Sequence, residues 1–491
     1  MTGTLQFSVP PLCSIKQDYS LHRNPTLHCC CLPSQIPQNE DSSLSGEDDS
    51  SPLILVERYS NGTAKRYVLA EEFSKQTFFD EQSTEAYKAH APDSAADLHW
   101  LPDEIKDFIL PAGFPGSVTD DYLEYMLWQF PTNVTGWICH ALVTSSLLKA
   151  VGVGSFSGSD AAASAAAIRW VSKDGIGAIG RLIIGGRFGS LFDDDPKQWR
   201  MYADFIGSAG SIFDLTTPLF PAYFLPLASL GNLSKAVARG LKDPSNRVIQ
   251  NHFAVFGNLG EIAAKEEVWE VTAQLLGLAL GISILDAPGI VKSYPALVST
   301  WTGLRLFHLW LRFQSLSVLK FKTINLKRAR ILAKSHVLHS KVPGCIDCNK
   351  EEQILLWQRF LQPRIVFGVP VDQLVGDQRS ATMVKKLFKL YTNEKYVLLV
   401  HQWERRDFEV RVSFKVGATG LTALQSVWQA YWLYKHWGDS LELIKVLEGS
   451  LLSMEGQFDD FMERLEDAGW NTSKVNINVS KEPYIEQLDP S

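Results

Sequence analysis

Charged side chains interrupt a long apolar tract in the middle of the chain, between about residues 133 and 316. In a bilayer or a deep core, an ionisable group is costly unless it is paired or hydrated, so such residues are the first candidates for function. Arg200 and Asp204 stand four residues apart, a spacing that places them on one face of a helix. The candidates for a polar path or a helix junction are Lys173, Asp174, Arg181, Asp204, Asp214, Glu261, Lys265 and Glu266.

The same charges also have an ordinary explanation. Gly175 and Gly177 follow Lys173 and Asp174 directly, and glycine weakens a helix. If the helix breaks there, Lys173–Asp174 and Lys265–Glu266 lie in short loops between helices, where charged residues are common. The sequence leaves both interpretations open.

Two weaker sites are visible. The residues His336, His339, Cys345 and Cys348 have the spacing HxxH and CxxC, and four such ligands can form a tetrahedral zinc site. Alternatively, a buried lysine such as Lys173 or Lys265 can form a Schiff base in a pyridoxal-phosphate-handling protein. However, the CxxC pair occurs once, and no phosphate-binding loop accompanies either lysine. The sequence also lacks GxxxxGK[ST], HExxH and GxSxG, so we expect no catalytic site and no cofactor.

Helical periodicity dominates the tract that must position these residues. It predicts helices over residues 133–153, 159–186, 199–215, 218–239, 246–264, 268–285 and 294–319, several of which approach the roughly 20 residues needed to cross a bilayer. A preceding helix from about residue 117 is expected to end by Phe130, because Pro131 disfavours helical geometry before it, and to lie at the membrane surface. Small residues at four-residue spacing, such as Gly277 and Gly281, favour close helix packing in membranes, although soluble bundles use them too.

The tract also shows an internal similarity. LLKAVGVG, residues 147–154, resembles LSKAVARG, residues 233–240, and KDGIGAIGRLIIG from Lys173 resembles KEEVWEVTAQLLG from Lys265. Duplicated helical units are a common way to build transporters, and chance similarity between helices rich in small residues is the alternative.

The flanking segments have the composition of water-soluble protein. Residues 1–52 suit a disordered N-terminus that includes a plastid transit peptide, and residues 53–100 a hairpin around Asn61–Gly62 followed by a linker. Residues 320–352 form a basic connector that is expected to contact anionic headgroups or to be a solvated helix. Residues 353–491 alternate strands (396–401, 408–415 and 474–479) with helices, as in an α/β domain.

We therefore predict a mainly α protein, with a multi-helix membrane-type bundle over residues 101–319, an internal repeat and a small α/β C-terminal domain. The net charge of -7 argues against nucleic acid as a partner. Seven cysteines, three of them adjacent, favour a reducing compartment.

Four segments within residues 101–319 carry a family resemblance. LPAGFPGSVTDDYLEY, KDGIGAIGRLI, RMYADFIGSAGSIFDLTTPLFP and NRVIQNHFAVFGNLGEIAAKEEVWE resemble the domain of the ROOT UVB SENSITIVE (RUS) family. The resemblance implies a membrane-associated protein of plastids or another endomembrane, which forms homo- or hetero-oligomers with family members. It also implies roles in plant early development, UV-B response and vitamin B6 homeostasis.

The family brings no established catalytic residues. The resemblance therefore implies a non-enzymatic protein. Two molecular roles stay open: a transporter-like membrane scaffold, and a soluble or peripheral interaction scaffold without transport.

Overall fold

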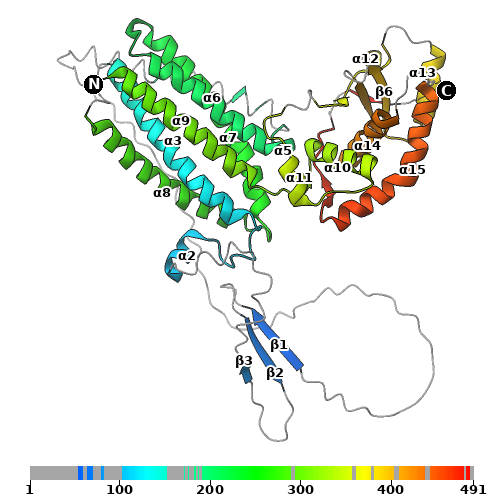
Figure 1. Cartoon of the computed structure of the whole chain (residues 1–491), viewed down its shortest axis with the longest axis horizontal. Helices are drawn as coiled ribbons and strands as arrows, with labels where there is room; N and C mark the ends of the chain where they lie inside the picture. The colour runs from blue at the N-terminus through cyan, green and yellow to red at the C-terminus, as the bar shows by residue number, and fades with distance from the viewer. Residues whose placement is uncertain are drawn as a thin grey trace, which may run out of the picture.

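A computed structural model describes residues 53–58, 64–69, 79–81, 102–151, 191–288, 293–356, 361–376, 381–402, 408–436, 443–479 and 483–486, and the single residues Val171, Gly175, Ala178, Leu182, Ile183 and Gly186. The described chain is mainly helical, and its C-terminal part contains a small sheet (Figure 1). This confirms the predicted order of a helical region followed by an α/β unit. Most of the first copy of the predicted repeat, residues 147–154 and 173–185, lies outside the described residues, so the repeat stays a prediction.

Five long helices lie side by side and form a bundle (Figure 1). They are α3 (Tyr122–Val151), α6 (Pro196–Thr216), α7 (Phe224–Phe253), α8 (Leu259–Asp286) and α9 (Tyr294–Ser317). Shorter elements connect them: α2 (Asp103–Ile109), α5 (Leu191–Asp194) and the 3-10 turn η1 (Pro221–Tyr223). Helix α3 packs against both α8 and α9, while α6 packs along α7.

Helix α3 continues through Pro131, so the predicted helix end at Phe130 is wrong. The hydroxyl groups of Thr132 and Thr135 donate to the carbonyl oxygens of Trp128 and Pro131, at 2.7 and 2.9 Å, around the proline. The first turns of α3 are core rather than membrane surface, because Tyr122 and Tyr125 are fully buried. Tertiary burial on both sides of the proline therefore outweighs its local cost of about 3 kcal/mol.

Close approach of helices depends on glycine, as the small-residue spacing predicts. A Cβ atom on Gly277 of α8 would lie 2.7 Å from the carbonyl oxygen of Val134 in α3, and one on Gly281 would lie 2.8 Å from Cβ of Ala141. Contacts this short exclude a side chain, so these two glycines set the distance between α3 and α8.

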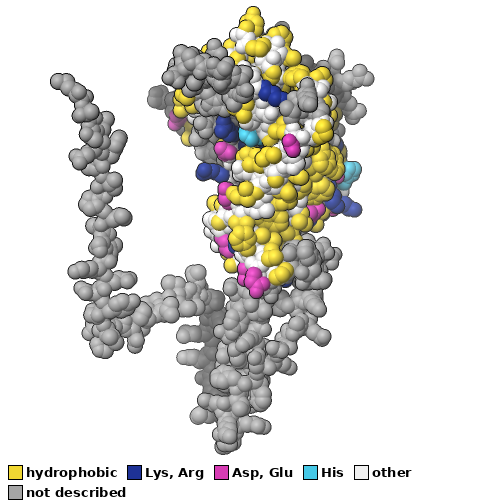
Figure 2. Space-filling model, turned by 90° about the vertical axis from the view of Figure 1, so that its left-hand side faces the viewer, with side chains coloured by type: hydrophobic (Ala, Val, Ile, Leu, Met, Phe, Trp, Pro, Cys, Tyr) yellow, Lys and Arg dark blue, Asp and Glu magenta, His cyan; other side chains and the backbone are white. Residues whose placement is uncertain are grey.

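The outer face of the bundle is apolar. On α8, Leu275 and Ile282 are 66% and 65% exposed, and Leu306 and Phe307 of α9 are also exposed. Figure 2 shows a face on which hydrophobic side chains predominate among the described residues. Within the described part of the chain, α8 is the one helix that is long and apolar enough to cross a membrane, with a mean hydropathy of 1.7 over its most apolar window, of which 17% is buried.

The C-terminal unit is built on a sheet of β5 (Arg364–Phe367), β7 (Glu409–Lys415) and β6 (Tyr396–Gln402), in that order, with β9 (Tyr484–Ile485) also pairing with β7. The predicted strand pair is confirmed as an antiparallel ladder with Leu398 opposite Val412. Helices α12 (Val371–Val375), α13 (Ala381–Leu390), α14 (Gly420–His436) and α15 (Leu443–Asp467) complete the unit. Because β7 is central, its polar residues Glu409 and Ser413 are buried along with its apolar ones.

The basic stretch after the bundle folds into this C-terminal core. It forms β4 (Thr323–Ile324), α10 (Leu326–His339) and α11 (Cys345–Glu351), and β4 pairs in parallel with β8 (Asn471–Val475). Lys327, Arg328 and Arg330 are buried, so the expectation of a headgroup-binding or solvated run is wrong for these three. Lys327 and Arg328 are held by ion pairs with Asp195 and Glu352.

At the N-terminal side, β1 (Leu53–Arg58), β2 (Ala64–Leu69) and β3 (Phe79–Glu81) form an antiparallel sheet. The predicted strand pair is confirmed, and its Asn61–Gly62 turn lies outside the described residues.

Candidate functional site

Asp204 is the centre of a buried charge network inside the bundle. Its carboxylate lies 3.1 Å from Nη1 of Arg200, one turn earlier in α6, as the four-residue spacing predicts. From α9, Nε of Arg312 lies 2.6 Å away and Nε2 of His308 3.6 Å away. Arg200 and Arg312 are each 1% exposed, so the network is removed from solvent.

Arg312, His308 and Arg305 also make hydrogen bonds outside the Asp204 carboxylate. Arg312 donates to the amide oxygen of Gln129 on α3, and Nδ1 of His308 donates to the carbonyl oxygen of Thr132 at 2.9 Å. Arg305 donates to Oγ of Ser208 at 2.6 Å and to the backbone oxygen of Asp204 at 2.8 Å. These contacts tie α3, α6 and α9 together, although Nε of Arg200 and Nε2 of His308 are buried with no hydrogen-bond partner among the described residues.

A second pair lies farther along α6. Asp214 forms an ion pair with Lys235 of α7. The two helices come close there because both carry glycine. A Cβ atom on Gly210 would lie 2.7 Å from the carbonyl oxygen of Gly231, and one on Gly231 would overlap with Oδ1 of Asp214. Gly231 thus leaves the space that the Asp214 carboxylate occupies.

These two groups line one cavity of about 430 Å³ between α3, α6, α7 and α9. Its volume falls within the range of small-molecule sites, which bundles commonly build between their helices. The charged side chains along it are Arg200, Lys235, Arg239, Lys242 and Arg305, against Asp204 and Asp214. Among the described lining residues, five cations face two carboxylates, which is an excess of positive charge. Such a surface attracts an anion and repels a cation.

Of the residues predicted from the sequence, Asp204 and Asp214 line this cavity. The predicted α8 residues lie elsewhere, as parts of a helix junction. Glu261 accepts a hydrogen bond from the backbone of Ala112 at 2.5 Å, and Lys265 donates to the carbonyl oxygens of residues 107 and 108. Glu266 accepts from Asn246 and Gln250 of α7, at 3.1 and 2.6 Å.

Two further predictions concern pyridoxal phosphate and the polar path. Lys265 is committed to backbone carbonyls, which does not suit a Schiff-base lysine, because that chemistry needs a desolvated, unprotonated amine. Lys173, Asp174 and Arg181 lie outside the described residues.

The weak zinc candidate is not assembled. His336 accepts a hydrogen bond from Trp428 Nε1 at 3.0 Å and pairs with Asp460 at 3.1 Å. Cys348 is fully buried, and burial raises the pKa of its thiol well above the usual value. Within the described ranges, no three His, Cys, Asp or Glu side chains converge as metal ligands.

Sequence reasoning missed the α9 half of the site. Arg305, His308 and Arg312 stand at positions i, i+3 and i+7, which is one face of a helix. That spacing in an otherwise apolar run, residues 294–319, was the available signal. Gln129, the partner of Arg312, carried no comparable signal, because it is a single amide with no charged residue at helical spacing to suggest a site.

Two family models cover this architecture. Residues 95–340 match the vitamin B6 photo-protection and homoeostasis domain, and residues 341–481 match the C-terminal domain of root UVB sensitive proteins. The chain therefore belongs to the RUS family, as its motifs predicted.

Relatives are found in plants and beyond. The chain is 59% identical to "Protein root UVB sensitive 5" of Arabidopsis thaliana over 94% of its own length and 93% of that protein. It is 27% identical to "Protein root UVB sensitive 2, chloroplastic" of the same plant, over 74% of the chain and 81% of that protein. It is 30% identical to "RUS family member 1" of Dictyostelium discoideum, over 57% of the chain and 53% of that protein. No solved structure matches the chain.

Proposed function

We propose that this RUS-family chain is an integral membrane protein whose bundle binds a small anionic solute in the cavity between α3, α6, α7 and α9, and that it serves vitamin B6 homoeostasis in this way. One observation carries the proposal: the bundle is charged inside and apolar outside. Arg200 and Arg312 are buried and their partner Asp204 is 15% exposed, whereas Leu275 and Ile282 are mostly exposed. This is the arrangement expected when the surroundings are lipid, because ionisable groups then face the bundle interior.

The exposure of α8, in addition to its length, supports the membrane assignment. The core helix of a soluble protein can be as long and as apolar, but it is then mostly buried. The apolar window of α8 is 17% buried, and Leu275 and Ile282 within this helix are mostly exposed.

The anion follows from the lining of the cavity. Asp204 and Asp214 are each matched by an arginine or lysine, and Lys242 is matched by Glu270 at 3.6 Å. Arg239 lines the cavity with no ion pair to a carboxylate among the described residues. An entering anion would therefore meet surplus positive charge. Vitamin B6 in its phosphorylated form is an aromatic ring with a phosphate monoester, a solute of the required charge.

The proposed cellular location of the chain rests on the name of a relative and not on a structural feature. One Arabidopsis relative is named chloroplastic. We extend that location to a plastid membrane for this chain, with another endomembrane as the alternative. A non-enzymatic role is part of the proposal, because both carboxylates of the cavity, Asp204 and Asp214, are held in ion pairs.

Membrane integration is tested by extraction. Membranes that contain the full chain are washed with alkaline carbonate, and the purified protein is then examined by size-exclusion chromatography with and without detergent. We expect retention in the carbonate pellet and aggregation when detergent is removed. Extraction by carbonate and a monodisperse protein without detergent would refute membrane integration.

Ligand binding is tested separately with pyridoxal 5′-phosphate and pyridoxal as probes, followed by tryptophan fluorescence. Arg239→Ala changes an exposed residue of the cavity. Lys341→Ala, at an exposed position outside the bundle and outside the lining of the cavity, is the control. Loss of one charge-assisted contact should weaken pyridoxal 5′-phosphate binding about tenfold in Arg239→Ala and leave it unchanged in the control. Equal binding by all three proteins, or stronger binding of neutral pyridoxal, would refute the anion assignment.

A second candidate function is an interaction scaffold. The exposed residues Leu275, Leu276 and Ile282 form a face on α8 that another RUS-family subunit would also bury. Charged substitutions there discriminate between the two functions: Leu275→Glu should abolish membrane insertion if lipid covers the face. If the chain is an interaction scaffold, Leu275→Glu should instead leave it soluble and abolish binding of the partner subunit.

A further inference from the structure

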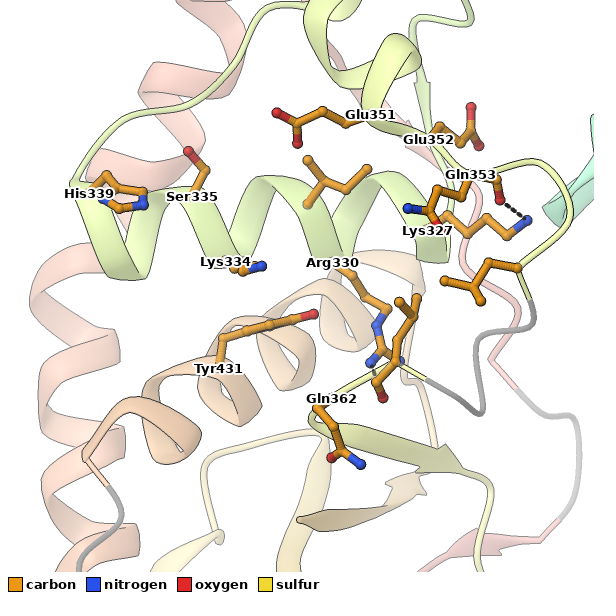
Figure 3. A pocket seen from close by; sticks show the side chains of 13 residues that line it. Lys327, Arg330, Lys334, Ser335, His339, Glu351, Glu352, Gln353, Gln362 and Tyr431 are labelled. Carbon is orange, nitrogen blue, oxygen red and sulfur yellow. Dashed lines mark hydrogen bonds between the residues drawn. The ribbon is translucent and has the colours of Figure 1, made fainter. Parts of the chain in front are cut away.

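A second cavity, of about 390 Å³, lies outside the bundle along one face of α10 (Figure 3). Lys327, Arg330 and Lys334 line it from successive turns, at positions i, i+3 and i+7. Tyr431 of α14 and Gln362, which precedes β5, lie across from the helix. Helix α10 therefore presents a row of cations to a hollow of small-molecule size.

Most of the charge around this cavity is already neutralised. Lys327 pairs with Asp195 at 2.6 Å, and the Glu352 carboxylate is shared by Lys197 and Arg328 at 3.2 Å each. Among the described residues, the lining cations with no ion pair are Arg330 and Lys334. The remaining carboxylate in the lining is Glu351, which is exposed and lies on the opposite side of α10 from Arg330 in Figure 3.

Arg330 is the unusual member. It is 2% exposed, yet the acceptors for its Nη2 are two uncharged carbonyl oxygens, those of Leu361 at 3.0 Å and Pro363 at 2.5 Å. Its Nε is buried with no acceptor among the described residues. Burial of a guanidinium without a counter-charge is costly, and an unmade hydrogen bond adds to that cost. An anion in the cavity would relieve both.

The neighbouring groups suit a tetrahedral oxyanion. The Tyr431 hydroxyl points towards Arg330 in Figure 3, and the two groups interact. A guanidinium, an ammonium and a hydroxyl can donate to several oxygens of one group, and the planar fork of arginine matches the oxygen spacing of phosphate. A carboxylate has two oxygens and a single charge, and so would leave part of this set unmatched.

We propose that the cavity on α10 binds a phosphate group, with Arg330 and Lys334 as its cationic ligands and Tyr431 as a hydroxyl donor. The phosphate is carried either by a soluble phosphate monoester or by a phospholipid headgroup. The site is separate from the bundle cavity.

The test uses the full chain in phosphatidylcholine nanodiscs. Inorganic phosphate and phosphoethanolamine are titrated by calorimetry, and soluble short-chain phosphatidic acid is titrated in parallel. Lys334→Ala removes an exposed cation and Tyr431→Phe removes only a hydroxyl, so neither should unfold the chain. Arg330→Lys keeps the charge but removes the fork, and Lys341→Ala, an exposed lysine just beyond α10, is the control.

We expect saturable phosphate binding that weakens about tenfold in Lys334→Ala and in Arg330→Lys, and less in Tyr431→Phe, while Lys341→Ala binds as the unchanged chain does. Tighter binding of the soluble probes identifies a metabolite as the source, and tighter binding of phosphatidic acid identifies a headgroup. The proposal is overturned if neither kind of probe binds, or if binding survives Lys334→Ala and Arg330→Lys. Loss of phosphate binding in Arg239→Ala instead would assign it to the bundle cavity, which overturns this site and supports the proposed function.

Discussion

Lys197 and Glu352 form a buried ion pair that joins the bundle to the C-terminal unit. Nζ of Lys197, in the first turn of α6, lies 3.2 Å from Oε2 of Glu352, directly after α11, and each side chain is 1% exposed. Arg328 of α10 donates to the same carboxylate at 3.2 Å. Burial alone would raise the pKa of Glu352, but the charges of Arg328 and Lys197 lower it to about 2. The carboxylate is therefore ionised at neutral pH and holds two cations from two parts of the chain.

Replacement of Glu352 by Gln should destabilise this joint. The change leaves Lys197 and Arg328 buried without a counter-charge, which typically costs about 3–5 kcal/mol of unfolding free energy. Denaturant unfolding followed by tryptophan fluorescence measures the loss. The adjacent Glu351 is exposed, so Glu351→Gln should change stability by less than about 0.5 kcal/mol. Equal effects of the two substitutions would contradict the role of the pair.

In the charge network of the bundle, we also expect a buried substitution to cost more unfolding free energy than an exposed one. Asp204→Asn removes the carboxylate that compensates Arg200 and Arg312, and we expect a loss of about 3–5 kcal/mol in the unfolding free energy. Asp243→Asn, at an exposed position of α7, is the matched control and should be close to neutral. Thermal unfolding in detergent compares the two variants. A native-like midpoint for Asp204→Asn would mean that the arginines do not depend on this carboxylate.

The close contact at Gly277 can be tested by comparing the same substitution at a packed and at an open glycine. Gly277→Ala puts a Cβ atom 2.7 Å from the Val134 carbonyl oxygen, whereas Gly303→Ala, on α9, meets no atom within 4 Å. In a helix interior, alanine is otherwise favoured over glycine by about 0.5–1 kcal/mol. Gly303→Ala should therefore leave the midpoint of thermal unfolding unchanged or raise it, and Gly277→Ala should lower it. If both raised the midpoint, α3 and α8 would have room that the structure does not show.

Stability should also depend on the protonation of Asp121. Burial would raise the pKa of this carboxyl, but hydrogen bonds from His252, Thr119 and the backbone of Lys320 lower it to about 2. A depressed folded-state pKa contributes stability above the unfolded value, and the contribution is lost as the pH falls from about 4 towards 2. The contribution is about 2 kcal/mol at neutral pH. The stability difference between the unchanged chain and Asp121→Asn should therefore be largest near neutral pH and shrink in this acid window, as measured by denaturant titration at each pH. A difference that does not vary with pH would contradict it.

Local signals predicted the helices better than their ends. The periodicity located the long helices of the bundle, but it placed a helix end before Pro131 and left residues 240–245 between two predicted helices. Helices α3 and α7 run through Pro131 and Pro244. A proline weakens a helix by a local amount, whereas the packing that compensates for it comes from residues distant in sequence. The strand pair β6–β7 was predictable because its alternation and its partner are both local.

The basic run at 320–334 shows the same limit. A row of lysines and arginines after an apolar helix normally indicates a solvated or headgroup-binding surface. Here Asp195 and Glu352, from 132 and 24 residues away along the chain from Lys327 and Arg328, draw the cations inward. No sequence pattern indicates that Asp195 or Glu352 pairs with these cations.

By itself, the sequence determined the helical class, the strand pair of the C-terminal unit, the family, and the Arg200–Asp204 contact, because each depends on spacing along a single element or on a continuous motif. The tertiary structure decided which charges meet: Asp204 with Arg312, Asp214 with Lys235, and Lys197 with Glu352. It also decided that Glu261, Lys265 and Glu266 anchor α8 rather than line the cavity. The interaction energy of two charges depends on the distance between them in space. That distance is set by how the helices pack.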